Sequence, residues 1–102
     1  MKQVLYHIYI MGEKMKYIKN KDIVGNCENG GYVLLNMING NFYGLYDLAE
    51  EIWSILDSES QFEEIVKRLS NKYIDISKSD ILNDVETFMQ ELLHEELVFI
   101  DD

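Results

Sequence analysis

Cysteine and histidine are the residue types in this chain that could supply a nucleophile, a base or a soft metal ligand. The chain contains Cys27, His7 and His94, and none of the three lies near another in the sequence. Zinc sites need four ligands at recognisable intervals, which these positions do not provide. A Cys–His nucleophile is geometrically possible, but nothing in the spacing supports it. We therefore expect no enzyme activity, no metal site and no cofactor.

Paired carboxylates and glycine-rich turns are the other motifs that could carry chemistry. Glu50-Glu51 and Glu63-Glu64 are adjacent residues, which point in different directions on a helix and so indicate solvated faces rather than an acid–base pair. Asn29-Gly30-Gly31 and Asn39-Gly40 lack the lysine and the following helix of a phosphate-binding loop. Hairpin turns explain both glycine motifs.

The bulk composition limits the class of protein. The chain has 102 residues, one cysteine and a hydrophobic fraction of 47%, which predicts a single globular domain without an internal disulfide. No apolar run approaches the roughly 18 residues of a membrane span, and the amino end lacks a secretory signal. We therefore expect a cytoplasmic protein with no membrane partner.

The net charge of −10 is distributed unevenly along the chain. Five lysines and two acidic residues precede Ile23, whereas four basic and 17 acidic residues follow. An acidic body repels phosphate backbones, which argues against nucleic acid, and favours a cationic peptide or partner. The alternative is that the acidic side chains only solvate helix faces.

The elements that would position a binding site begin with three short apolar runs. These runs are Ile23–Cys27, Tyr32–Ile38 and Asn41–Leu45, and Asn-Gly turns divide them. Asn and Gly tolerate the positive φ angles of a type I′ hairpin turn, so the pattern predicts a three-stranded antiparallel sheet. Both faces of the central run are largely apolar, which predicts a strand that is covered on two sides.

Three helices are predicted after the strands, which makes the fold class α+β. Asp47 is the expected N-cap of the first helix. Ser60-Gln61-Phe62-Glu63 fits a capping box at the start of the second helix. Ser77 or Ser79 is the expected cap of the third helix, and Leu97–Ile100 is expected to be an extended segment that packs back on the core.

Residues 1–22 are predicted to form an N-terminal extension that could add an extra strand, and residues 23–102 to form the domain. Val4–Ile10 is rich in β-branched and aromatic residues, and a short strand is expected at Met15–Ile18. Val4–Ile10 could occupy an open sheet edge in its own subunit or in a twin. The chain is accordingly expected to be a monomer or a dimer.

The last predicted strand, Asn41–Leu45, is expected to leave one edge of the sheet open. Unpaired N–H and C=O groups on such an edge can bind an extended peptide as an added strand, and pockets for alternate side chains then give specificity. A groove between this strand and the third helix would supply those pockets, and acidic side chains on the helix could meet a lysine or arginine of the peptide. The residues predicted to bind the peptide are Asn41, Phe42, Tyr43, Gly44, Leu45, Ile81, Asp84, Val85 and Phe88.

A family resemblance lies in segments spread over residues 23–100. They are Gly31–Asn36, Asn39–Leu45, Leu48–Trp53 with Leu56, Phe62–Val66 with Leu69 and Tyr73, Asp84-Val85, Phe88-Met89, Leu92-Leu93 and Leu97-Val98. In order and spacing these segments resemble the PqqD-like family. Its members are small proteins of pyrroloquinoline-quinone biosynthesis and the related recognition elements of ribosomally made, post-translationally modified peptides. Residues 1–22 have no counterpart in it, and Tyr46 stands where many relatives carry a polar residue.

The resemblance implies a winged helix-turn-helix-like fold that serves to bind peptides. In such proteins the leader segment of a precursor peptide lies along the third strand, in a cleft walled by the third helix. The domain then presents the precursor to a modifying enzyme, which is a radical-SAM maturase or the protease and cyclase of a lasso-peptide pathway.

A winged-helix DNA-binding regulator is the competing hypothesis, because the same order of elements suits that architecture. Such a regulator needs a basic recognition helix. The second predicted helix offers Lys67, Arg68 and Lys72, and the third is strongly acidic.

Overall fold

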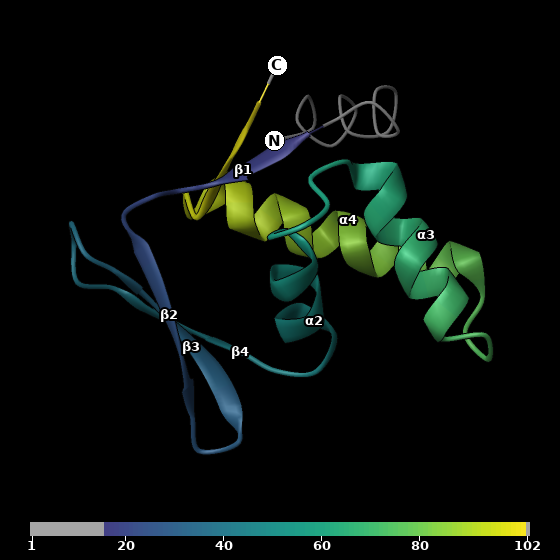
Figure 1. Cartoon of the computed structure of the whole chain (residues 1–102), viewed down its shortest axis with the longest axis horizontal. Helices are drawn as coiled ribbons and strands as arrows, with labels where there is room; N and C mark the ends of the chain where they lie inside the picture. Colours follow the sequence, from purple (N-terminus) through teal and green to yellow (C-terminus); the bar gives the residue numbers. More distant parts are fainter. Residues whose placement is uncertain (1–15, 102) are drawn as a thin grey trace.

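The computed structural model describes residues 16–101 (Figure 1). Its elements are β1 (Tyr17–Lys19), β2 (Ile23–Glu28), β3 (Gly31–Asn36), β4 (Phe42–Leu45), α2 (Leu48–Ile55), α3 (Phe62–Lys72), α4 (Lys78–His94) and β5 (Val98–Ile100). The predicted α+β fold, a three-stranded antiparallel sheet followed by three helices, is confirmed. None of the helices in this part of the chain is long and apolar enough to cross a membrane.

The three-stranded sheet has the order β2-β3-β4, with both neighbouring pairs antiparallel. Asn29 and Gly30 connect β2 to β3 with φ angles of 50° and 81°, as expected for a type I′ turn. The second connection is longer than the predicted two residues. There the side-chain oxygen of Asn36 accepts from the N–H groups of Ile38 and Asn39, at 2.8 and 3.2 Å. This Asx-type turn ends β3 at Asn36, before the predicted end at Ile38.

Neither of the first two predicted helix caps forms its side-chain hydrogen bond, although Asp47 is the N-cap residue of α2 as predicted. Asp47 precedes α2, but its φ angle is 53° and its side chain accepts no capping hydrogen bond. The predicted capping box before α3 does not form, and Gln61 is the N-cap residue instead. The cause is tertiary, because Gln61 forms a β-bridge with Lys16 and the Ser60 carbonyl accepts from the Tyr17 N–H at 2.9 Å.

The N-cap of α4 agrees with the sequence. Of the two candidate serines, Ser77 is the cap, and its hydroxyl oxygen accepts from the Asp80 N–H at 3.1 Å. This bond satisfies one of the amide groups that the first turn of a helix leaves unpaired, and the Asp80 carboxylate lies at the positive end of the helix.

Strands β1 and β5 form a second, two-stranded antiparallel sheet, in which Tyr17 pairs with Ile100. β1 overlaps the short strand expected at Met15–Ile18, beginning two residues and ending one residue later, whereas Val4–Ile10 lies outside the described residues. Lys19 attaches β1 to α2, because its ammonium lies 4.2 Å from the centre of a Trp53 ring and 2.5 Å from the Asp57 carboxylate. The described part of the predicted extension is therefore integrated into the domain.

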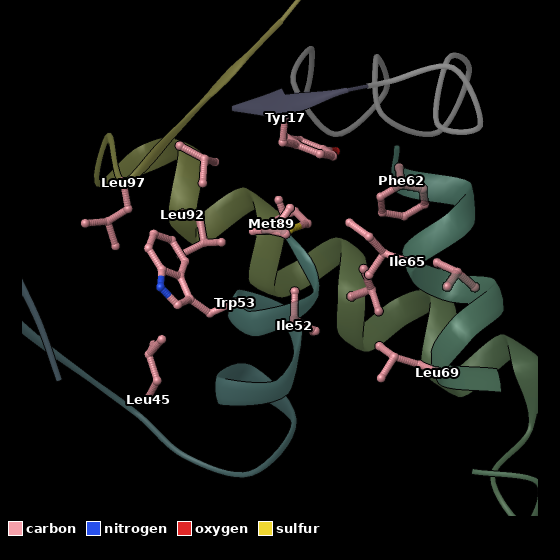
Figure 2. Close-up of a cluster of buried hydrophobic side chains, with 14 of the residues drawn as sticks. Tyr17, Leu45, Ile52, Trp53, Phe62, Ile65, Leu69, Met89, Leu92 and Leu97 are labelled. Carbon is pink, nitrogen blue, oxygen red and sulfur yellow. The ribbon is translucent and has the colours of Figure 1, made fainter. Parts of the chain in front are cut away.

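The hydrophobic core lies between the three helices and one face of the three-stranded sheet. Figure 2 shows that its side chains come from β1, β4, α2, α3, α4 and the segment before β5. Leu97 and Val98 are buried, so the predicted packing of the final segment on the core is confirmed. The core-facing side of the sheet contributes Leu34 and Leu45.

The opposite face of the sheet is open in residues 16–101. Val33 and Leu35 of the central strand are half-buried, and their neighbours Val24 and Phe42 are exposed. The prediction of a strand covered on two sides is wrong for this part of the chain. All three helices lie on the same side of the sheet (Figure 1), so no layer within residues 16–101 covers its other face.

Candidate functional site

Strand β4 forms one edge of the sheet, with no further described strand beyond it. The Asn36 N–H donates to the Asn41 carbonyl at 2.9 Å, which makes these two residues a hydrogen-bonded pair. Hydrogen-bonded and non-hydrogen-bonded pairs alternate along an antiparallel ladder. Tyr43 therefore bonds to β3, whereas the N–H and C=O groups of Phe42 and Gly44 point to the open side. The edge thus offers two donors and two acceptors to an added strand.

The side chains of β4 alternate between the two faces of the sheet. Tyr43 and Leu45 share a face with the buried Leu34, to which Tyr43 is directly paired. Phe42 lies on the opposite face and is 71% exposed. Gly44 also faces outward, and a Cβ atom there would lie 3.2 Å from the Tyr46 ring.

A groove of about 750 Å³ lies between β4 and α4. Tyr43, Gly44 and Leu45 line its strand side, and α4 supplies the facing wall from Thr87 to Glu95. Ala49 of α2 and Leu97, just before β5, complete the lining. The groove therefore places an apolar surface beside main-chain groups of β4 that have no partner within residues 16–101.

One hydrogen bond joins the two walls of the groove. The Tyr43 hydroxyl donates to the Glu95 carboxylate at 3.1 Å, and the Asn41 side-chain amide donates to the same hydroxyl at 3.5 Å. Glu95 is the C-cap residue of α4, so this bond connects the edge strand to the end of the helix. It holds the strand and the helix at a fixed separation on this side of the groove.

The residues predicted to bind a peptide fall into two groups in the structure. Tyr43, Gly44, Leu45 and Phe88 line the groove. Asn41 contacts the groove through the Tyr43 hydroxyl, whereas Phe42 contributes its main-chain groups and directs its side chain away.

The remaining three predicted residues lie on α4. Ile81 and Val85 have exposed fractions of 1% and 0%, so their side chains belong to the core and do not reach the groove. Asp84 is exposed and precedes Phe88 by one helical turn. Because residues four apart share a helix face, Asp84 lies on the face that continues into the groove.

Several groove residues were missed by sequence reasoning. Glu91 and Glu95 follow Asp84 and Phe88 at steps of three and four residues, so the helical period could have found them. Ala49 and Leu97 had no such signal, because tertiary packing brings α2 and the segment before β5 to the groove.

The groups with clearly shifted pKa values in residues 16–101 lie outside the groove. Burial, reinforced by the negative charge of Glu86, raises the pKa of Tyr17, whose hydroxyl has no hydrogen-bond partner. Partial burial acts to raise the pKa of Glu51. Hydrogen bonds from Lys72 and Tyr73, both 2.5 Å long, and the charge of Lys72 outweigh it and hold this pKa below its ordinary value. These shifts reflect contacts within the core and between α2 and α3.

The candidate nucleophile and base are on separate elements. Cys27 is exposed on β2 and His94 is exposed at the end of α4, where it lines the groove, whereas His7 lies outside the described residues. Within residues 16–101, no three His, Cys, Asp or Glu side chains are grouped so that they could hold a metal ion.

The sheet, the three helices that follow it and the groove beside the edge strand define a winged helix-turn-helix-like domain. Residues 31–98 match the family model described as coenzyme PQQ synthesis protein D (PqqD), so the chain belongs to the PqqD family. The expected family resemblance is thereby confirmed. Among curated proteins, none matches the sequence closely enough to count as a relative.

Two solved structures share this fold. One is described as TbiB1 in complex with the TbiA(beta) leader peptide; it is 26% identical with a TM-score of 0.72, over 79% of this chain and 93% of that one. The other is described as lasso peptide synthetase B1 complexed with the leader peptide. It is 21% identical with a TM-score of 0.71, over 82% of this chain and 98% of that one.

Proposed function

We propose that this protein binds the leader segment of a ribosomally synthesised precursor peptide by β-strand addition to β4 and presents the precursor to a modifying enzyme. The observation that carries the proposal is the edge of β4 beside the groove, where no strand of residues 16–101 pairs with the main-chain groups of Phe42 and Gly44. The TbiB1 structure, which shares the fold, is itself a complex with a leader peptide, and this supports the same use of the fold here.

The length and pleat of β4 set the form of the bound segment. Four strand residues span about 13 Å, so about four leader residues would pair with the edge. Alternate side chains of the added strand point to opposite faces of the sheet, and every second one would enter the groove. There it would contact Leu45, Phe88 and Leu97. Burial of one aliphatic side chain stabilises a complex by about 1.5–3 kcal/mol, so we expect this contact to dominate affinity.

The charge of the groove favours a basic residue in the leader. Glu91 and Glu95 line the α4 wall, and Asp84 lies on the same face one turn before Phe88. An exposed pair between such a carboxylate and a leader lysine or arginine contributes about 0–1 kcal/mol. The acidic wall therefore orients the peptide and excludes acidic competitors more than it adds to affinity.

The proposed role is recognition without catalysis. The partner enzyme is a radical-SAM maturase or a lasso-peptide protease. This chain binds the leader and contributes no reacting group. The resemblance of the PqqD-like family to peptide-recognition elements supports this assignment, as does the placement of Cys27 and His94 on different elements, β2 and α4.

Isothermal titration calorimetry of the purified protein against the synthetic leader encoded beside its gene tests the proposal. We expect low-micromolar or tighter binding, and loss of binding when alternate leader residues are N-methylated, because N-methylation removes the donors of an added strand. A scrambled leader of the same composition is the control. No heat of binding at high micromolar concentration with a folded protein would refute the proposal.

The DNA-binding alternative gains no support from the structure. Lys72 of α3 pairs with Glu51 at 2.5 Å, and Arg68 donates to the Ser58 hydroxyl at 3.0 Å. Both side chains are thus engaged within the domain, and the exposed face of α4 is acidic. A recognition helix needs several free basic side chains for phosphate contacts.

A further inference from the structure

The outer face of the three-stranded sheet carries an apolar surface that the proposed leader site does not use. We define this outer face by the apolar side chains that alternate away from the core, Val24, Val33, Leu35, Met37, Phe42 and Tyr46; the polar Asn26, paired with Val33, lies on the same face. Val24 pairs with Leu35 and Leu35 pairs with Phe42, so these three form one row across the sheet. Val24 is 51% exposed, and Phe42 at the other end of the row is more exposed still.

Tyr46 extends this surface toward the first hairpin turn of the sheet, at Asn29-Gly30. Its ring lies over Gly31 and Gly44, where Cβ atoms would stand 2.5 and 3.2 Å from ring atoms. The two glycines therefore let the ring lie flat against the outer face, although Tyr46 remains 63% exposed. Met37, which is 62% exposed, continues the face beyond Leu35, because its N–H pairs with the Asp22 carbonyl at 2.9 Å.

The size of this surface suits a specific protein contact. An aromatic side chain alone contributes 150–250 Å² when buried, so the outer face offers on the order of 500 Å² of apolar area. A standard interface takes about 800 Å² from each partner, of which the centre is apolar and the rim polar. The outer face has the dimensions of such a centre.

The charges around the outer face select the kind of partner. Asp22 and Glu28 stand at the two ends of β2 and Asp47 directly follows Tyr46, whereas Lys21, next to Asp22, is the basic residue among these flanking positions. The whole chain carries a net charge of −10, so two copies placed face to face would repel each other. An apolar patch with a basic rim complements this surface, and a second copy of the chain does not.

We propose that the outer face docks the modifying enzyme, through an apolar patch of the enzyme that is rimmed by basic side chains. This inference rests on the proposed function. The groove and the outer face lie on opposite sides of β4, so a leader in the groove leaves the outer face free. An added leader strand would also continue the sheet beside Phe42 and Gly44. Its outward side chains would join the surface that the enzyme contacts.

The test uses a double variant, Val24→Lys with Met37→Lys, which places two charges on the outer face. Neither residue lies in β4 or in the groove. The matched control is Ile74→Lys with Ile76→Lys, which adds the same two charges, because both residues are exposed in the loop between α3 and α4, away from the sheet. Circular dichroism and thermal unfolding verify that all three proteins fold.

Two affinities are measured for each protein. Calorimetry with the leader peptide reports on the groove, and biolayer interferometry with the purified modifying enzyme encoded beside the gene, in the presence of the full precursor, reports on the outer face. We expect the double variant to bind leader within twofold of wild type and to bind the enzyme at least tenfold more weakly. The control should match wild type in both measurements, and salt should weaken enzyme binding.

Other results would overturn the inference. Equal enzyme affinity of the double variant and wild type, or no enzyme binding by wild type, refutes docking at the outer face. A wild-type dimer in analytical ultracentrifugation that the double variant dissolves would assign the face to a second copy instead. If the wild-type protein does not bind the leader, the proposed function itself is refuted. The leader titration separates that result from the others.

Discussion

The substitution Phe42→Pro is the most direct test of strand addition to β4. The Phe42 N–H points to the open side of the strand and makes no bond to β3, so Phe42→Pro removes one donor from the edge and no bond from the sheet ladder. The matched variant Phe42→Ala keeps the N–H and removes a side chain that is directed away from the groove. The pair of variants therefore separates the main-chain group from the side chain at a single position.

The magnitude follows from the hydrogen bond that proline deletes. When a leader carbonyl loses its donor, the binding free energy falls by about 1–3 kcal/mol, and each 1.4 kcal/mol changes the affinity tenfold. We therefore expect Phe42→Pro to weaken leader binding by about fivefold to a hundredfold. Phe42→Ala should bind the leader within about twofold of wild type, because the lost side chain makes no contact in the groove.

Calorimetry with the synthetic leader measures both variants, and thermal unfolding shows whether the sheet is retained. A folded Phe42→Pro protein that binds the leader as tightly as Phe42→Ala would refute the reasoning, because the edge of β4 would then make no main-chain contact with the peptide. Weak binding by both variants would instead place the Phe42 side chain in the binding site, contrary to its position in the structure.

Further predictions concern the core, the groove wall and the α2–α3 contact. Tyr17→Phe should raise the free energy of unfolding by about 1 kcal/mol in urea titrations, because it removes a buried hydroxyl without a partner. Since the pKa of Tyr17 is raised in the folded state, wild-type stability should persist below pH ~10 and decline at higher pH, and Tyr17→Phe should decline less. Glu91→Gln should weaken binding of a basic leader by about twofold to fivefold in low salt, and by less in high salt. Glu51→Gln should lower the thermal midpoint at pH 7; because the pKa of Glu51 is depressed, wild type should lose this advantage as pH falls below ~4.

Local chemistry was enough to predict several parts of the fold. Asn29 and Gly30 form the predicted turn because their own backbone preferences allow positive φ angles. Ser77 caps α4 because its hydroxyl reaches an amide three residues ahead in the same chain segment. Where the interacting groups are close in sequence, residue type and spacing determine the geometry.

The site could be predicted only in part from the sequence. Tyr43, Leu45 and Phe88 were found because strand and helix periods place them on one face of each element. Ile81 and Val85 fit the same helical pattern, but their side chains are buried in the core. An apolar stripe does not reveal where on a helix the core ends and the groove begins.

The sequence alone determined the types of element and their order, the hairpin turn at Asn29-Gly30 and the cap of α4, since each depends on neighbours within a few residues. Tertiary structure decided where α3 begins, because the Ser60 carbonyl, which an N-cap residue would offer to the first helical amide, accepts from the Tyr17 N–H instead, and the Gln61 carbonyl accepts the helical bond from Ile65. It also decided that one sheet face of residues 16–101 is left open, since all three helices pack on the other. Such outcomes depend on contacts between segments far apart in the chain, which no local pattern encodes.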